Sequence, residues 1–131
     1  MMRTIAVEEA FSLPQLATRV APWGGKSVLR PDRAAEWARR LPDFDELRLA
    51  EMDAHGVDVA VLSLTAPGIQ VQPDTAVAVT DAAIANDALA EIVARQPDRY
   101  AGLAALPLQN PDAAADELDG RSARWGSTVP W

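Results

Sequence analysis

Two adjacent carboxylates, Glu8 and Glu9, are the residues of this chain best placed to do chemistry. They end a short apolar and β-branched run, which is typical of a buried strand over residues 3–8. In parallel α/β folds, ligands and catalytic groups gather at the carboxyl ends of the strands. A carboxylate at such an end can bind a metal ion, although an acidic pair can also be no more than a solvated strand end.

Other side chains with catalytic potential are few. His55 is the only histidine, and we expect it to bond carbonyls at the end of a helix rather than to act in catalysis. Residues 23–27 (WGGKS) lack the first glycine and the preceding strand of a phosphate-binding loop, which argues against phosphate binding. The absence of cysteine excludes disulfides, thiolate metal sites and a cysteine nucleophile. A metal site built from this chain alone would use carboxylates and be incomplete, because catalytic zinc usually takes three protein ligands including histidine.

The elements that position these residues alternate along the chain. Besides the strand over 3–8, apolar runs predict strands over 57–64 and 100–106. Helices are expected over 33–41 with Asp32 as N-cap, 43–55 with Gly56 after its end, 74–96, and 111–118 with Asn110 as N-cap. The rest of residues 12–43 is rich in proline and glycine and is expected to be irregular. Strands that alternate with helices imply a parallel sheet with right-handed crossovers.

Composition limits the classes of function. With 131 residues, 49% of them hydrophobic, the chain is expected to form one globular domain or part of a larger one. Its formal net charge of −7 argues against nucleic acid and anionic membranes as partners. The sequence shows no signal-peptide pattern and no apolar run of the roughly 20 residues that a membrane span requires. We therefore expect a soluble cytoplasmic protein.

Five segments, taken in order, resemble one family. They are residues 5–14 (IAVEEAFSLP), 48–57 (RLAEMDAHGV), 62–70 (LSLTAPGIQ), 85–91 (ANDALAE) and 97–109 (PDRYAGLAALPLQ). Together they are similar to the metal-dependent aromatic acid decarboxylases of the amidohydrolase superfamily (amidohydrolase 2 type), of the 2,3-dihydroxybenzoate and γ-resorcylate decarboxylase kind. The resemblance runs from about residue 3 to residue 118 without large gaps.

This resemblance implies the N-terminal portion, about three βα units, of a TIM-type (β/α)8 barrel, because such barrels run to ~250 residues. Residues 1–118 would be this partial barrel domain. In the family the first-strand motif is Glu-x-His or Glu-x-Ala, and its first Glu binds a divalent metal ion (Zn, Mg or Mn). This role carries over to Glu8, with Ala10 in the place of a second ligand.

The resemblance also implies a substrate pocket. Phe11 and the loop of Thr65, Ala66 and Pro67 would line it, although Phe11 can equally be an ordinary core residue. The family's later His and Asp ligands would lie beyond residue 131, so no catalytic residue is assigned within the chain.

Residues 119–131 depart from the family pattern. Residues 120–127 (GRSARWGS) show neither helical nor strand periodicity. Eleven of the 12 basic residues are arginine, which suggests GC-rich codons. When residues 125–131 and a following TGA stop codon are back-translated with such codons and read from the last base of each, they give Gly-Phe-Asp-Gly-Ala-Leu-Val, which is similar to the family's fourth strand. We therefore hypothesise a frameshift near residue 119.

The implied function is that of a metal-dependent, non-oxidative decarboxylase of hydroxylated aromatic carboxylic acids, of which this chain is an N-terminal fragment. Its partners would be a small aromatic carboxylic acid and, in the full-length form, further copies in a homo-oligomer; no organic cofactor is expected. One alternative is another hydrolase or lyase on the same scaffold. Another is a non-catalytic relic or interaction module, because three barrel units leave the edges of the first and third strands unpaired. In either case the chain alone is expected to be inactive.

Overall fold

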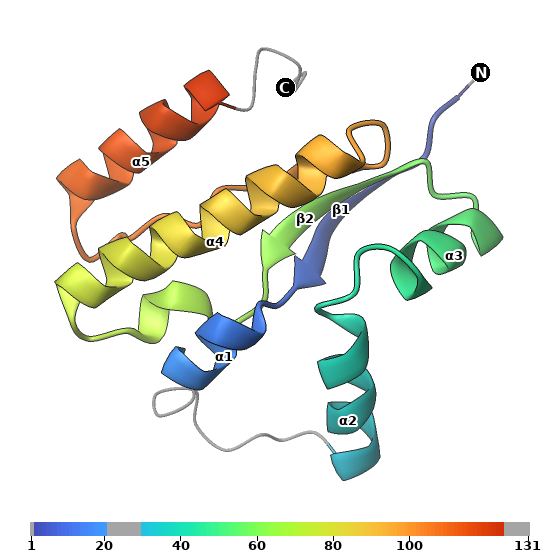
Figure 1. The fold of residues 1–131 in the computed structure, drawn as a ribbon, viewed down its shortest axis with the longest axis horizontal. Helices are drawn as coiled ribbons and strands as arrows, with labels where there is room; N and C mark the ends of the chain where they lie inside the picture. The colour runs from blue at the N-terminus through green and yellow to red at the C-terminus, as the bar shows by residue number, and fades with distance from the viewer. Residues whose placement is uncertain (1, 21–29, 125–131) are drawn as a thin grey trace.

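The computed structural model describes residues 2–20 and 30–124. Its centre is a three-stranded sheet in the order β1 (Ile5–Phe11), β2 (Val59–Leu64) and β3 (Tyr100–Gly102). Both pairs of neighbours run parallel, as the alternation of strands and helices predicts. In Figure 1, β1 and β2 lie side by side with their carboxyl ends at the same edge of the sheet.

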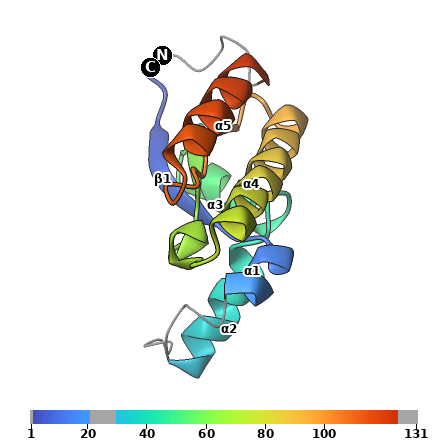
Figure 2. The ribbon, with the colours of Figure 1, turned by 90° about the vertical axis from the view of Figure 1, so that its left-hand side faces the viewer.

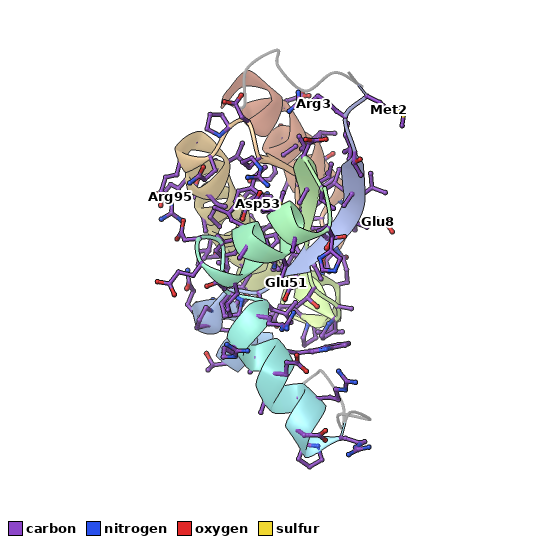
Figure 3. All side chains as sticks on the ribbon, turned by 90° about the vertical axis from the view of Figure 1, so that its right-hand side faces the viewer. Met2, Arg3, Glu8, Glu51, Asp53 and Arg95 are labelled. Atoms are coloured by element: carbon purple, nitrogen blue, oxygen red, sulfur yellow. The ribbon has the colours of Figure 1, made fainter. Side chains whose placement is uncertain are left out.

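Helices connect the strands. Between β1 and β2 the chain forms α1 (Pro14–Val20), α2 (Pro31–Arg40) and α3 (Leu47–Ala54). Between β2 and β3 it forms the 3-10 helix η1 (Gly68–Val71) and α4 (Thr75–Arg95). The last helix, α5 (Pro111–Arg124), follows β3. Figures 2 and 3 view the molecule from opposite sides, and both show β1 at its margin with α3, α4 and α5 on one side of the strand. Among the described residues, the other face of the sheet carries no helix.

The hydrophobic core lies between the sheet and its helices. Residues in register on neighbouring parallel strands share a face, and Ala6, Ala60 and Tyr100 form one such row. Ala60 and Tyr100 are 1% and 2% exposed, which identifies the helix-covered face. The core cluster also contains Phe11, Leu13, Leu16, Phe44, Met52, Leu62, Ala85, Leu89 and Ile92. On the opposite face, Ile5 is 56% exposed, so the inner wall of the partial barrel is open to solvent.

The three predicted strands exist, but two of them differ in length. β1 runs to Phe11 rather than to residue 8, because its ladder with β2 resumes after an irregularity. β3 ends at Gly102 rather than at residue 106. Beyond it, the side chain of Asn86 bonds the backbone of Ala105 in the place of a neighbouring strand: its Oδ1 accepts from the Ala105 N–H at 2.8 Å, and its Nδ2 donates to the Ala105 carbonyl at 2.9 Å.

The loop between β1 and β2 is more ordered than the sequence predicts. α1 falls in the segment expected to be irregular; its first residue, Pro14, suits a helix start, and Leu16 is only 3% exposed. α2 begins at Pro31 with Arg30 as N-cap, so the prediction of Asp32 as N-cap is wrong. α3 begins at Leu47 rather than at residue 43.

The ends of the later helices follow the predicted capping signals, with one exception. Asp74 and Asn110 accept from the backbone N–H groups of Val77 and Ala113, both at 3.0 Å. The expected end of the last helix at residue 118 is wrong, because α5 continues to Arg124 and includes residues 119–124. Residues 125–131, on which the frameshift hypothesis rests, lie outside the described residues.

Candidate metal and substrate site

Glu8 lies at an irregularity of β1. The ladder pairs Ala6 with Ala60 and then Glu9 with Leu62, so two residues of β1 face one residue of β2. Glu8 has a φ of +59°, in the left-handed region that residues other than glycine rarely adopt. Its side chain is exposed and projects from β1 on the side away from the helices (Figure 3). The bulge thus presents the Glu8 carboxylate on the open face of the sheet.

Glu9 belongs to a different surface. It is in register with Leu62, which is fully buried beneath the helices. It lines a groove of about 430 Å³ that runs between β1 and the helices α2 and α3. Arg40, Arg48 and Glu51 also line this groove. Only the first of the two adjacent glutamates therefore faces the inner side of the sheet.

A smaller cavity, of about 280 Å³, opens at the carboxyl ends of β2 and β3. Its lining residues are Ser63, Leu64, Gln70, Leu103, Ala104, Ala105, Leu106 and Leu108. Ser63 is in register with Ala10, so this cavity and the end of β1 share one edge of the sheet. A mostly aliphatic wall with a few polar groups suits a small ligand with an apolar ring.

The residues predicted to line the substrate pocket are not among those that line this cavity. Phe11 is 1% exposed and packs edge-on against Phe44 at a ring-centroid distance of 5.9 Å, so the structure supports its core alternative. The Thr65 N–H donates to the Phe11 carbonyl at 2.8 Å and joins the ends of β1 and β2. Thr65 lines the groove beside β1, whereas Ala66 and Pro67 are exposed at the carboxyl end of β2.

An arginine to which the sequence assigns no role ties the end of β1 to the segment before α3. Arg48 donates from Nη2 to the carbonyls of Ala10 at 2.8 Å and Leu41 at 3.3 Å. Its Nε donates to the carbonyl of Asp43 at 3.1 Å. The guanidinium carbon lies 5.7 Å from the centre of the Phe44 ring. The contact with Ala10 joins segments 38 positions apart, so no local pattern in the sequence predicts it.

Burial shifts the pKa values of two groups at this contact, Arg48 and Tyr100. Desolvation lowers the pKa of Arg48, while the nearby Tyr100, Glu9 and Asp43 act in the opposite direction. An arginine nevertheless stays charged in a protein. Burial raises the pKa of Tyr100 to about 12, and its hydroxyl donates to the Phe44 carbonyl at 2.6 Å. The end of β1 is thus held by a permanent cation, while a neutral phenol holds the backbone of Phe44, whose ring lies next to that cation.

Asn86 has a similar role for the loop after β3. It is fully buried in α4, and besides bonding Ala105 its Nδ2 donates to Glu117 Oε1 at 2.9 Å. Ala105 lines the smaller cavity, so Asn86 fixes part of the cavity wall. A single asparagine in the middle of an alanine-rich helix is a signal that could have revealed this role, because asparagine is unfavourable there without a specific partner.

His55 has the structural role that the sequence predicts. It follows α3, and its Nδ1 lies 2.9 Å from the carbonyl of Glu51 in the last turn of that helix. The residue precedes β2 and so lies toward the amino end of that strand, away from the carboxyl edge of the sheet.

No group of three or more His, Cys, Asp or Glu side chains that could hold a metal ion occurs within residues 2–20 and 30–124. In the same residues, no helix is long and apolar enough to cross a membrane. Glu8 is therefore a candidate for one metal ligand, and it does not form a complete site with its described neighbours.

Fold and site together define a class of protein. Parallel βα units are the start of a TIM-type barrel, whose binding face lies at the carboxyl ends of the strands, and Glu8 lies on the inner face of the first of these strands. The profile of the family described as Amidohydrolase matches residues 11–124, and the chain belongs to this family. The resemblance deduced from the five sequence segments is thereby confirmed.

The curated relatives are decarboxylases. The "Gamma-resorcylate decarboxylase" of Rhizobium radiobacter is 44% identical over 118 residues, which are 90% of this chain and 35% of that protein. The enzyme of the same name from Polaromonas sp. (strain JS666 / ATCC BAA-500) is 48% identical over 116 residues, 88% of this chain and 34% of that protein. The chain thus spans about a third of the length of the curated relatives it matches.

Solved structures agree with this comparison. A 2,6-dihydroxybenzoate decarboxylase complexed with 2,6-dihydroxybenzoate matches with a TM-score of 0.86 and 41% identity over 96% of this chain and 37% of the other. A dihydroxybenzoic acid decarboxylase from Polaromonas sp. JS666, with bound manganese and the inhibitor 2-nitroresorcinol, matches with a TM-score of 0.84 and 38% identity over 96% and 36%. The three-stranded sheet is the N-terminal part of this barrel.

Proposed function

We propose that this chain forms the first three βα units of a metal-dependent, non-oxidative decarboxylase of hydroxylated aromatic carboxylic acids. The observation that carries the proposal is the position of Glu8, an exposed carboxylate that the bulge in the middle of the first barrel strand presents on the open face of the sheet. Support comes from the relatives named gamma-resorcylate decarboxylase and from the manganese bound in one solved relative.

A divalent ion such as Mn²⁺, Zn²⁺ or Mg²⁺ fits Glu8 in its chemistry, because carboxylate oxygens are ligands for all three. Glu8 alone does not fill a coordination sphere, so further ligands have to come from outside the described residues. When bound, the ion would orient and polarise the carboxylate and the adjacent hydroxyl of the substrate.

The smaller cavity, at the carboxyl ends of β2 and β3, would bind the aromatic ring of the substrate. Its aliphatic walls would exclude water from one side of the ring, and Ser63 would offer a polar contact. Gln70 donates to the Leu106 carbonyl at 2.9 Å and so holds the cavity wall instead of reaching for the ligand. Thr65, Ala66 and Pro67 would border the opening, because they follow β2 at the same edge.

The test compares the 131-residue chain with a chimera. In the chimera, residues 1–118 replace the matching part of the Rhizobium radiobacter relative, which supplies the rest of a barrel. Release of CO₂ from 2,6-dihydroxybenzoate is measured with and without added Mn²⁺. We expect no turnover above background from the chain alone and metal-dependent turnover from the chimera.

Matched variants assign the ligand. Glu8→Gln should lower turnover of the chimera by about 100-fold or more, since even residues that only support a ligand can cost 10–100-fold. Glu9→Gln, one residue away on the other surface, should change it little. Full turnover by a Glu8→Gln chimera, or substantial turnover by the chain alone, would contradict the proposal.

A further inference from the structure

Arg48 reaches from α3 to the carboxyl end of β1, which follows the bulge at Glu8. Its Nη2 donates to the Ala10 carbonyl at 2.8 Å, two residues beyond Glu8 in the same strand. The Phe11 carbonyl turns toward β2, where it accepts from the Thr65 N–H at 2.8 Å. Because successive carbonyls of a strand point to opposite sides, the Ala10 carbonyl lies at the other edge of β1, where Arg48 binds it.

Arg48 is itself held in place. The side chain of Asp43 accepts from the N–H groups of Leu47 at 2.8 Å and Arg48 at 3.0 Å, while the Asp43 carbonyl accepts from Arg48 Nε. The Leu41 carbonyl takes a further bond from Arg48 Nη2 and also accepts from the Ser12 N–H at 3.2 Å. The planar guanidinium, fixed by these bonds, therefore connects the segment before α3 to the end of β1.

The backbone at Glu8 needs such support. A residue other than glycine at φ +59° is held at a cost, which persists only where the surrounding structure determines the conformation. On the carboxyl side of the bulge, the described contacts that determine it are the resumed ladder with β2 and the bond from Arg48 to Ala10. The ladder holds one edge of β1, and Arg48 holds the other.

We propose that Arg48 is a positioning residue for Glu8: by binding the Ala10 carbonyl at the free edge of β1, it keeps the bulge that aims the Glu8 carboxylate at the metal position. The inference rests on the proposed function in one respect, that Glu8 is a metal ligand. Arg48 touches neither metal nor substrate. It acts through the backbone of the strand.

The test uses the 131-residue chain and two readouts from nuclear magnetic resonance. The first is the intraresidue nuclear Overhauser effect between the amide and α protons of Glu8, which is strong at positive φ and weak in an extended strand. The second is broadening of the Ala10 amide signal during titration with Mn²⁺, which also detects a weak site. The first readout needs no metal and is moved only by the backbone conformation of Glu8.

The variants are Arg48→Met, Arg48→Lys and the control Arg40→Met. Arg40 lines the same groove but pairs with the side chains of Glu36 and Glu51, at 3.1 and 3.5 Å. The Arg48→Met variant should lose the strong intraresidue nuclear Overhauser effect of Glu8. It should also bind Mn²⁺ at least about tenfold more weakly than the natural chain. Arg48→Lys, which keeps the charge but not the planar guanidinium, should show an intermediate loss and supplies the answer where the Met variant does not fold.

The outcomes separate the two proposals. An unchanged Glu8 effect in the folded Arg48 variants overturns the positioning role, as does a lost effect with unchanged Mn²⁺ affinity. Equal losses in Arg40→Met also overturn it, because they would show a general loosening of the groove. If Glu8→Gln in the otherwise natural chain leaves the Mn²⁺ broadening unchanged, the ligand role under the proposed function fails, whereas the effect at Glu8 still decides whether Arg48 sets the backbone.

Discussion

Replacing Tyr100 by phenylalanine should change how the stability of the protein depends on pH. Tyr100 is the only tyrosine of the chain, is 2% exposed, and donates its hydroxyl to the Phe44 carbonyl at 2.6 Å. Burial raises the pKa of this phenol from 10.0 to about 12, with nearby carboxylates adding to the rise and Arg48 opposing it. The contact helps to hold the Phe44 segment on which Arg48 rests.

The sign follows from proton binding. Between pH 10 and pH 12 the phenol of the unfolded chain loses its proton while that of the folded chain keeps it. The folded state then binds more protons, so the free energy of unfolding falls as pH rises through this window. The rise in the pKa of Tyr100 from 10.0 to about 12 corresponds to a loss of at most about 2–3 kcal/mol in the free energy of unfolding across this window. Below pH 10 this contribution is fully present.

Tyr100→Phe removes both the hydrogen bond and the titration. At pH 8 the variant should be less stable by about 1–2 kcal/mol, because a hydrogen bond is lost and a carbonyl is left without it. At pH 12 the difference should vanish or reverse, since the natural protein has lost stability that the variant never had.

Urea unfolding of both proteins between pH 8 and pH 12 measures this difference directly. The absorbance of phenolate in the folded protein reports the same group alone, since the chain has a single tyrosine. The reasoning is refuted if the phenol titrates at its ordinary pKa near 10 in the folded protein, or if the two stability curves run parallel over the whole range.

Substitutions at three positions test the geometry around the site. Gly102→Ala places a new Cβ 2.6 Å from Leu89 Cδ2 and should destabilise the protein by about 1–3 kcal/mol in urea unfolding; an unchanged midpoint would contradict the close approach of β3 to α4. Asn86→Ala removes both side-chain bonds to Ala105 and should cost about 1–3 kcal/mol and speed amide hydrogen exchange at Ala105, whereas unaltered exchange would mean that another group holds this loop. Glu8→Gly should be more stable than Glu8→Ala by about 1 kcal/mol in thermal unfolding, because glycine tolerates positive φ; equal stabilities would argue against the bulge.

Much of the fold can be predicted from local patterns. The continuous apolar run of β2 identifies a buried strand, and Asp74 and Pro97 bracket the alanine-rich α4 closely. Such signals lie within a few residues of the element they define. α1 is harder to predict because it is short and is stabilised by tertiary burial of Leu13 and Leu16 rather than by its own pattern.

The candidate site could be predicted only in part. The resemblance indicates Glu8 as a metal ligand, but the bulge that orients it cannot be predicted from the sequence. The β-branched and acidic residues of this segment suit a regular strand equally well. Arg48 and Ala10 are 38 positions apart, and Asn86 and Ala105 are 19 apart. Contacts of this kind exist only after the helices have packed on the sheet, so a local pattern can mark Asn86 as unusual in its helix but cannot identify the partner of either residue.

The position of a metal ion relative to Glu8 tests the central claim most directly. Crystals of the chimera of residues 1–118 with the remaining barrel of the Rhizobium radiobacter relative would be grown with Mn²⁺, and the ion would be located by its anomalous diffraction. We predict a manganese peak about 2.0–2.2 Å from a carboxylate oxygen of Glu8, at the carboxyl ends of the barrel strands. A fully occupied manganese site at that face with no contact to Glu8 would contradict the account.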